Sequence, residues 1–411
     1  MTLNYIWIGF FLVGFLFGLI RLIFFGDLDV FPNMVKSTFD MSKTGFEISL
    51  YLTGVMTLWL GIMRIGEKGG MVNIMARLVG PFFSRLFPEI PKNHPALGSM
   101  IMNFSANMLG LDNAATPLGL KAMKEMQEVN KEKEVASNAQ IMFLVLNTSG
   151  LTLIPLSIMI DRASVDSKNP TDVFIPLLVA TFFSTIGGLI FVAIKQKIRL
   201  LDKVILAYLL GATGIIAGIV YYFSTLSKQQ LEVTSNLASS IIILSIIVSF
   251  MTLGLTKKIN LYETFIEGAK DGFSIAIKII PYLIAILVAI GIFRESGAMD
   301  ILLDGIRSFF TFLNVDTQFV DALPTAFMKP LSGSAARGMN LEIMKSFEPD
   351  SFVGRLSSVL RGATETTFYI VAVYFGSVNI KKTRYAITAG LFADLCGIIA
   401  AILIGYMFFQ A

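Results

Sequence analysis

The sequence reads GIMR at residues 61–64 and GIFR at residues 291–294, and the likeness continues along the chain after both. Each is followed by a glycine and, twelve residues later, by a phenylalanine pair: Gly70 with Phe82-Phe83, and Gly297 with Phe309-Phe310. Each copy then enters a segment punctuated by Gly and Pro and an apolar stretch interrupted by Thr, Ser and Gly. In apolar chains, such repeats with polar breaks are typical of transporters that bind their solute near the middle of the membrane.

The composition is that of a membrane protein. Of the 411 residues, 55% are hydrophobic and 15% are charged, against about 25% charged in soluble domains, and the mean hydropathy is +0.72. The net charge of +4 gives no reason to expect a nucleic-acid partner. One cysteine, Cys396, and one histidine, His94, exclude a disulfide framework and a metal centre built on these residues. Phosphate-binding and metallopeptidase motifs are absent from the sequence, so we expect neither an ATP-driven pump nor an enzyme, and no cofactor.

Nine stretches are long and apolar enough to cross a hydrocarbon core of about 30 Å. They are residues 5–25, 47–63, 137–160, 172–194, 202–223, 236–255, 272–293, 352–375 and 385–409. The first stretch lacks the basic start of a signal peptide and is too long for one, so we interpret it as a retained span.

Two pairs of segments between these spans are too polar to cross a membrane themselves. Residues 68–90 and 297–314 mix charged and apolar residues at helical spacing, as interfacial amphipathic helices do. Residues 95–123 and 322–345 are polar and contain helix breakers. Irregular backbone is tolerated at membrane depth only inside protein or along a cavity, so we predict two re-entrant helical hairpins. The predicted fold is an all-α integral membrane protein with two repeats.

Basic residues indicate the orientation of the chain. They gather in four of the loops between predicted spans, at residues 121–133, 195–203, 257–258 and 381–384. With nine spans, all four loops lie on one side, which the positive-inside rule places in the cytoplasm. The N-terminus is then cytoplasmic and the C-terminus lies outside. Five spans separate the starts of the two repeats, an odd number, so the repeats should be inverted relative to each other.

The first predicted hairpin is rich in oxygen ligands. Its amides, carboxylate and hydroxyl belong to Asn103, Asn107, Asp112, Asn113 and Thr116. Such groups suit a hard cation or a polyhydroxylated solute, and a carboxylate facing lipid would cost about 2.5–3.5 kcal/mol. The alternative is that these residues only cap the two half-helices of a turn.

The second predicted hairpin has a tip of small residues. The segment Ser332-Gly333-Ser334 would expose backbone amides at the start of a half-helix, which suits an anionic or hydroxylated group. Arg337 could pair with a ligand anion or with Asp112 of the first hairpin. The alternative is a tight turn in which Arg337 extends to the membrane interface.

The spans that follow the hairpins carry polar residues at matching depth. They are Asn147, Thr148 and Ser149 in the first copy, and Thr364, Glu365 and Thr367 in the second. A carboxylate inside a span is a functional candidate by default, although Glu365 could instead only neutralise Arg361 four residues earlier. Asp394, in the last span, is interpreted as a structural partner of Arg384; the alternative is a proton relay.

These patterns predict a binding site with two kinds of ligand. The expected solute-binding residues are Asn107, Asp112, Asn113, Thr116, Ser332, Ser334, Arg337, Thr364, Glu365 and Thr367. The expected ligands of a coupling ion are Asn103, Asn147, Thr148, Ser149 and Glu365.

Long motifs in both halves resemble known proteins. The sequence LGLDNAATPLGLKAM at residues 109–123 is similar to the hallmark of spore maturation protein A. The sequences KPLSGS at 329–334, PDSF at 349–352 and TETTFYIVAVYFG at 364–376 are similar to spore maturation protein B. The chain therefore resembles a fusion of the two. Both are members of the nucleoside recognition (Gate) superfamily, which includes the concentrative nucleoside transporters.

The resemblance implies an A-like half at residues 1–200, with the first repeat at about 47–195. Linker helices would occupy 201–260, and a B-like half with the second repeat would occupy 261–411. It also implies inverted hairpin-and-span repeats around a central site. The expected location is the cytoplasmic (inner) membrane of a bacterium.

We therefore expect a secondary transporter or permease that moves a small polar, nucleoside-like solute by movement of one repeat against the other. Na⁺ or H⁺ coupling would act through Asp112, Glu365 and the Asn and Thr cluster. The alternative is a non-transporting membrane module that binds a nucleoside-like signal or a protein partner during spore or envelope maturation. The expected partners are the solute and the lipid bilayer. A homo-oligomer is a further candidate, because Gly14 and Gly18 form a GxxxG pattern; the high glycine content of membrane helices explains that pattern equally well.

Overall fold

The computed structural model is all-helical over the residues that it describes. These are residues 2–91, 94–110, 112–200, 202–226 and 228–410. The side chains of some residues within helices, among them Asp112 and Asn113, lie outside the description. An all-α membrane protein is thus confirmed for the described part of the chain.

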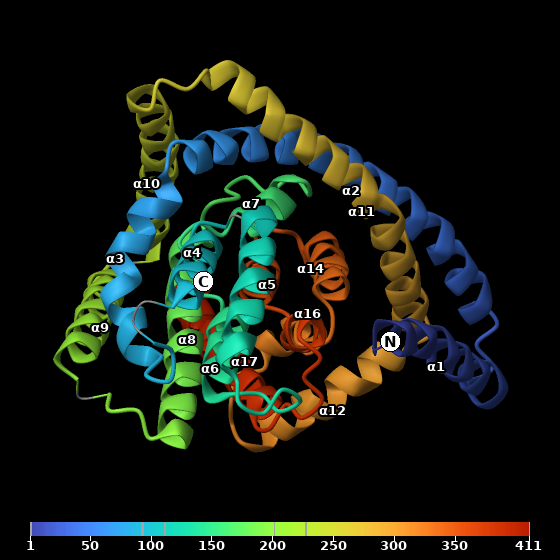
Figure 1. Cartoon of the computed structure of the whole chain (residues 1–411). Helices are drawn as coiled ribbons and strands as arrows, with labels where there is room; N and C mark the ends of the chain where they lie inside the picture. The colour runs from blue at the N-terminus through green and yellow to red at the C-terminus, as the bar shows by residue number, and fades with distance from the viewer. Residues whose placement is uncertain (1, 92–93, 111, 201, 227, 411) are drawn as a thin grey trace.

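The helices form an outer frame and an inner bundle (Figure 1). The frame consists of α1 (Thr2–Phe25), α2 (Val30–Lys68), α3 (Met71–Leu86), α9 (Lys203–Ser224), α10 (Lys228–Thr256), α11 (Leu261–Glu295) and α12 (Ala298–Phe312). The first half contributes α4 (Pro95–Met108), α5 (Asp112–Val129), α6 (Asn138–Ser149), α7 (Leu156–Ala163) and α8 (Phe174–Gln196) to the inner bundle. The second half contributes the 3-10 helix η1 (Gln318–Ala322), α13 (Leu323–Met328), α14 (Gly333–Phe347), α15 (Phe352–Gly362), α16 (Thr367–Ser377) and α17 (Ala386–Phe409).

In the described part of the chain, six helices are long and apolar enough to cross a membrane, and they coincide with six of the nine predicted spans. They are Trp7–Phe25, Val30–Lys68, Phe174–Gln196, Lys203–Phe223, Leu237–Thr256 and Ala386–Phe409. The predicted span 272–293 lies inside α11, and the predicted spans 137–160 and 352–375 are each divided into two shorter helices. The divisions fall at the polar residues of these two stretches, Asn147 to Ser149 and Thr364 to Thr367, where we expected the spans to be broken.

The predicted span 47–63 is only part of α2, which begins at Val30 and runs for 39 residues. The sequence did not predict a helix before residue 47, because Lys36 and Asp40 are charged, as loop residues often are. The structure turns both outward, while Val30 and Met34 are buried on the other face of the same helix. At 1.5 Å per residue, α2 and its partner α11 are about 50–60 Å long, so each exceeds a single perpendicular crossing.

The helices α2 and α11 run side by side along one edge of the frame (Figure 1). Glycines permit their close approach. A Cβ atom at Gly268 would lie 2.3 Å from the Leu60 carbonyl oxygen, and one at Gly272 would lie 2.5 Å from the Met56 carbonyl oxygen. Backbone therefore meets backbone at this contact, and one helix of each half is held to the other.

The predicted amphipathic segments and hairpins are helical. The helices α3 and α12 each begin after a glycine of positive φ, 90° at Gly70 and 82° at Gly297, which L-residues with a Cβ adopt only with strain. The hairpins are α4–α5 and α13–α14. The same order therefore recurs in both halves: a long helix, an amphipathic helix, a hairpin, a divided helix and an apolar helix.

Three of the four predicted basic loops lie together at one end of the inner bundle. The Ala136 amide donates to the Lys382 carbonyl at 3.0 Å, and Arg384 donates to the Asn138 side chain at 3.0 Å. Gln196 donates to the Asn138 carbonyl at 2.8 Å. These contacts tie the first half to the second.

Replacing Gly268 with Ala should destabilise the protein, because the new methyl group must push α11 away from the α2 backbone. Overpacking of this kind costs about 1–3 kcal/mol. The matched control is Gly214→Ala, since a Cβ atom at Gly214 meets nothing within 4 Å. In thermal unfolding of the detergent-purified protein, only Gly268→Ala should lower Tm. Equal Tm values for the two variants would contradict the close contact.

Candidate functional site

Two divided helices meet at the centre of the inner bundle. The first break lies between α6 and α7 and opens at Gly150, whose φ is 54°. The second lies between α15 and α16, at residues 363–366. The Glu365 amide donates to the Thr148 carbonyl at 2.7 Å. A Cβ atom at Gly150 would lie 3.0 Å from Glu365 Cγ, so glycine is required where the breaks touch.

Each hairpin tip lies against the break of its own half. In the first half, the Leu153 amide donates to the Met108 carbonyl at 2.7 Å, and Gly110 (φ 70°) leaves room for the Ile154 carbonyl. In the second half, the Phe368 amide donates to the Pro330 carbonyl at 3.1 Å. Hairpin tips and helix breaks are therefore neighbours, as the resemblance implied.

A buried amide cluster joins the first hairpin to both breaks. Asn107 donates to Asn147 Oδ1 at 2.7 Å, and the Tyr374 hydroxyl donates to the same oxygen at 3.2 Å. Asn103 donates to the Ala115 carbonyl at 2.8 Å and to the Tyr374 hydroxyl at 3.3 Å. Tyr374 lies one helical turn beyond Val371 and two beyond Thr367, on the same face of α16. That spacing was a signal that the sequence analysis missed.

The hydroxyl groups at the breaks have mixed roles. Those of Thr148 and Ser149 donate to carbonyls within α6, at 3.0 and 3.3 Å. The Thr367 hydroxyl donates to Asp394 Oδ2 at 2.7 Å. The predicted pairing of Asp394 with Arg384 is wrong, because Arg384 lies at the basic end of the bundle beside Asn138.

Glu365 forms an ion pair with Lys329, at 3.6 Å between Nζ and Oε2. Lys329 belongs to the second hairpin and is 9% exposed, whereas the Glu365 side chain is 51% exposed. Sequence analysis overlooked this lysine, although it precedes the proline of the KPLSGS motif. In the described part of the chain, no group of three or more His, Cys, Asp or Glu side chains could hold a metal ion.

Six predicted site residues require separate comment. Ser332 caps α14 by accepting from the Ala335 amide at 3.2 Å, while Thr116 and Ser334 are exposed. Arg337 pairs with Asp161 of α7, from Nε to Oδ1 at 2.9 Å; its suggested pairing with Asp112 concerns a side chain outside the described residues. The side chains of Asp112 and Asn113 lie outside the described residues.

A second charge network, absent from our sequence predictions, links the halves at the other end of the bundle. Arg162, which is fully buried, lies 2.9 Å from both Asp172 and Asp350. Arg355 donates to Asp172 at 2.7 Å, and Asp161 also pairs with Arg361. The sequence analysis ended the third span at residue 160 and so treated Asp161 and Arg162 as loop residues.

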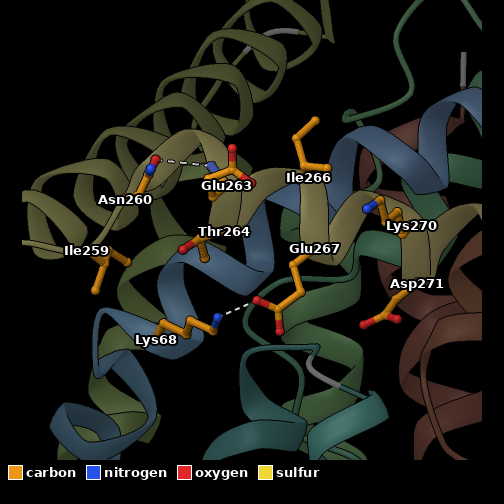
Figure 2. A pocket seen from close by; sticks show the side chains of 9 residues that line it. All are labelled: Lys68, Ile259, Asn260, Glu263, Thr264, Ile266, Glu267, Lys270 and Asp271. Atoms are coloured by element: carbon orange, nitrogen blue, oxygen red, sulfur yellow. Dashed lines mark hydrogen bonds and ion pairs between the residues drawn. The ribbon is translucent and has the colours of Figure 1, made fainter.

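The structure also has an open surface cavity of about 660 Å³, lined by the C-terminal end of α2 and the N-terminal part of α11 (Figure 2). These residues are far from both helix breaks in the sequence. Its lining residues are Lys68, Ile259, Asn260, Glu263, Thr264, Ile266, Glu267, Lys270 and Asp271. Several of these side chains have a structural role in holding or capping the two helices. Lys68 and Arg64 pair with Glu267, and Asn260 caps α11 by accepting from the Glu263 amide at 3.2 Å. We therefore place the candidate site at the helix breaks.

Removing Arg162 should strongly destabilise the protein, because two buried or half-buried carboxylates lose their shared partner. Breaking a buried ion pair from one side costs about 3–5 kcal/mol. The variant Arg162→Leu should therefore lower Tm sharply in thermal unfolding. Lys43→Ala is the control, since its pair with Glu47 is exposed and 3.8 Å long. A Tm of Arg162→Leu equal to that of the control would refute the role of this network.

Tyr374→Phe should cost about 1–3 kcal/mol, because the Asn147 and Asn103 side chains lose a buried hydrogen-bond partner. The control on the same helix is Tyr369→Phe, since Tyr369 is 59% exposed. Thermal unfolding of both variants measures the difference, and no difference would mean that the hydroxyl is dispensable.

The chain is similar to characterised proteins over most of its length. The family model described as nucleoside recognition (Gate) matches residues 49–161 and 276–381. Spore maturation protein B of Bacillus subtilis (strain 168) is 45% identical over 164 residues, which are 40% of this chain and 90% of that protein. Spore maturation protein A of the same organism is 41% identical over 187 residues, which are 46% of this chain and 92% of that protein.

No solved structure matches the chain. The two family matches together cover more than half of the sequence, and each relative is matched over nearly its whole length. The chain combines similarity to both relatives, and it belongs to the nucleoside recognition (Gate) family.

Proposed function

We propose that the protein is a secondary transporter for a small polar solute of nucleoside type, bound where the two helix breaks meet. The observation that carries the proposal is the contact between the Glu365 amide and the Thr148 carbonyl, at 2.7 Å, with a hairpin tip on either side. Broken helices present backbone amides and carbonyls to a ligand at membrane depth, where a continuous helix presents none. The family description, nucleoside recognition, supports the solute class.

The inverted repeats and the cytoplasmic N-terminus remain part of this proposal. They are supported by the recurring order of elements and by the basic loops that meet near Asn138. The proposed solute ligands are Asn107, Asp112, Asn113, Thr116, Ser334, Thr364, Glu365 and Thr367.

The way the halves interlock favours one kind of movement. Each half contributes a helix to the α2–α11 contact in the frame, and each contributes to the charge network around Arg162 in the bundle. Displacing one repeat against the other would break both contacts. Displacing the inner bundle against the frame would preserve both, so we favour that movement for alternating access.

A specific observation favours the rival function, a membrane module that does not transport. The amide groups of Asn107 and Asn147 bond to each other, and Tyr374 connects Asn147 to Asn103. A buried cluster of this kind, held by hydrogen bonds within the protein, also suits a rigid structural centre. The names of the relatives, spore maturation proteins A and B, are compatible with such a role in the envelope.

Ligand binding separates the two functions. Purified protein should be screened by thermal unfolding against nucleosides, nucleobases and small carboxylic acids. A solute at about 100 times its dissociation constant stabilises the folded state by about 2.7 kcal/mol. We expect a nucleoside to raise Tm and to be taken up by proteoliposomes that contain the protein.

Two variants locate the site of that response. Asn107→Ala should weaken the stabilisation by the solute, because Asn107 lies between the hairpin tip and the first break. Asn73→Ala, on the exposed face of α3, should keep the full response. If none of these compounds raises the Tm of the folded protein, solute binding is rejected. Binding without uptake would favour the non-transporting module.

A further inference from the structure

Among the side chains that the structure describes, Glu365, Lys329 and Asp394 interact electrostatically at the centre of the bundle. Glu365 pairs with Lys329, and both groups act electrostatically on the carboxylate of Asp394. Asp394 is 2% exposed, so water does not stabilise its charge. Buried charges in proteins are paired or coordinate an ion. The charge of the Asp394 carboxylate must therefore be balanced by a cation or removed by a proton.

The two oxygens of Asp394 have different surroundings. Oδ2 accepts from the Thr367 hydroxyl at 2.7 Å. Oδ1 is buried and has no hydrogen-bond partner among the described residues. Burying a carboxylate oxygen without a hydrogen-bond partner costs free energy. A ligand that binds next to Oδ1 would remove this cost.

The neighbouring groups offer further oxygens and no compensating charge. The Thr364 hydroxyl also faces the carboxylate, and the Thr148 hydroxyl lies beside Gly390, one turn earlier on α17. The helix α15 ends at Gly362, which leaves the carbonyls of its last turn without partners inside that helix. From α8, Ser184 contacts α17 but donates to the Ala393 carbonyl at 2.9 Å.

We propose that Asp394 is the centre of a binding site for one small monovalent cation, of the size of Na⁺, completed by Thr364, Thr367 and carbonyls of the second helix break. Carboxylate, hydroxyl and carbonyl oxygens are the ligands that hard cations take. The site differs from the coupling-ion ligands expected from the sequence, which centred on Asn147 and Glu365. Its coupling role rests on the proposed transporter function, whereas the cation site itself is testable without any solute.

The charge balance predicts how neighbouring residues tune the site. The positive charge of Lys329 interacts with the carboxylates of both Glu365 and Asp394. In Lys329→Gln, the Asp394 carboxylate loses a competing positive charge, and the cation should bind more tightly. In Glu365→Gln, Lys329 is released to neutralise Asp394, and the cation should bind more weakly. Because charges interact more strongly inside a protein than in water, we expect each shift to be about tenfold or larger.

The experiment is a titration of the detergent-purified protein with NaCl, with choline chloride added to keep ionic strength constant, at neutral pH. The readout is Tm in thermal unfolding. The wild type should gain Tm as Na⁺ replaces choline, and Asp394→Asn should show no such gain. The midpoint of the Na⁺ response should fall at least tenfold in Lys329→Gln and rise at least tenfold in Glu365→Gln.

Three results would overturn the site. They are equal Tm values of the wild type in NaCl and choline chloride, a full Na⁺ response in Asp394→Asn, and shifts of the Lys329→Gln and Glu365→Gln midpoints in the same direction. If Asp394→Asn does not fold, the opposite shifts of the other two variants still decide the question. A Na⁺ response with a flat nucleoside panel would support this site and reject the solute proposal.

Discussion

The structure depends on a constraint of the bilayer: every backbone amide and carbonyl at membrane depth needs a partner inside the protein. Two interrupted helices would violate this constraint separately. Here they satisfy it together, because the Glu365 amide donates to the Thr148 carbonyl at 2.7 Å and the hairpins supply further partners. The remaining elements hold this crossing in place. The ion network around Arg162 fixes one end of the inner bundle, the loops around Asn138 fix the other, and α2 packs on α11 outside it.

The sequence predicted the helices correctly in segments where a repeated motif or a continuous apolar stretch was clear. The repeated GIMR and GIFR motifs, the apolar stretches and the Gly- and Pro-rich hairpins all correspond to elements in the structure. The failures have a common cause, which is that long-range partners override local polarity. Lys36 made the start of α2 resemble a loop, although the buried face of the helix decides its extent. Arg361 seemed to belong to Glu365 by sequence spacing, yet Asp161 from the other half is its partner across the bundle.

The candidate site was predicted as a region more successfully than as a set of contacts. Asn107 and Asn147 were expected to lie together and do so, at 2.7 Å. Lys329 and Tyr374 were missed because a lone lysine and a tyrosine in an apolar helix have ordinary structural explanations in a sequence. Only the packing of both halves gives them a shared environment with Glu365, Asn103 and Asp394. Residues of both halves contribute to this centre, and the two halves are similar to two separate proteins of Bacillus subtilis.

The central claim is that the helix breaks form a site reached alternately from the two sides of the membrane. Ser334, exposed at the start of α14 beside the second hairpin tip, allows a test that needs no knowledge of the solute. A single cysteine at this position, in a Cys396→Ala background, should be exposed to a membrane-impermeant maleimide in right-side-out and in inside-out vesicles. Our account predicts labelling from both sides of the membrane. Labelling from one side only, in protein shown to be folded, would contradict it.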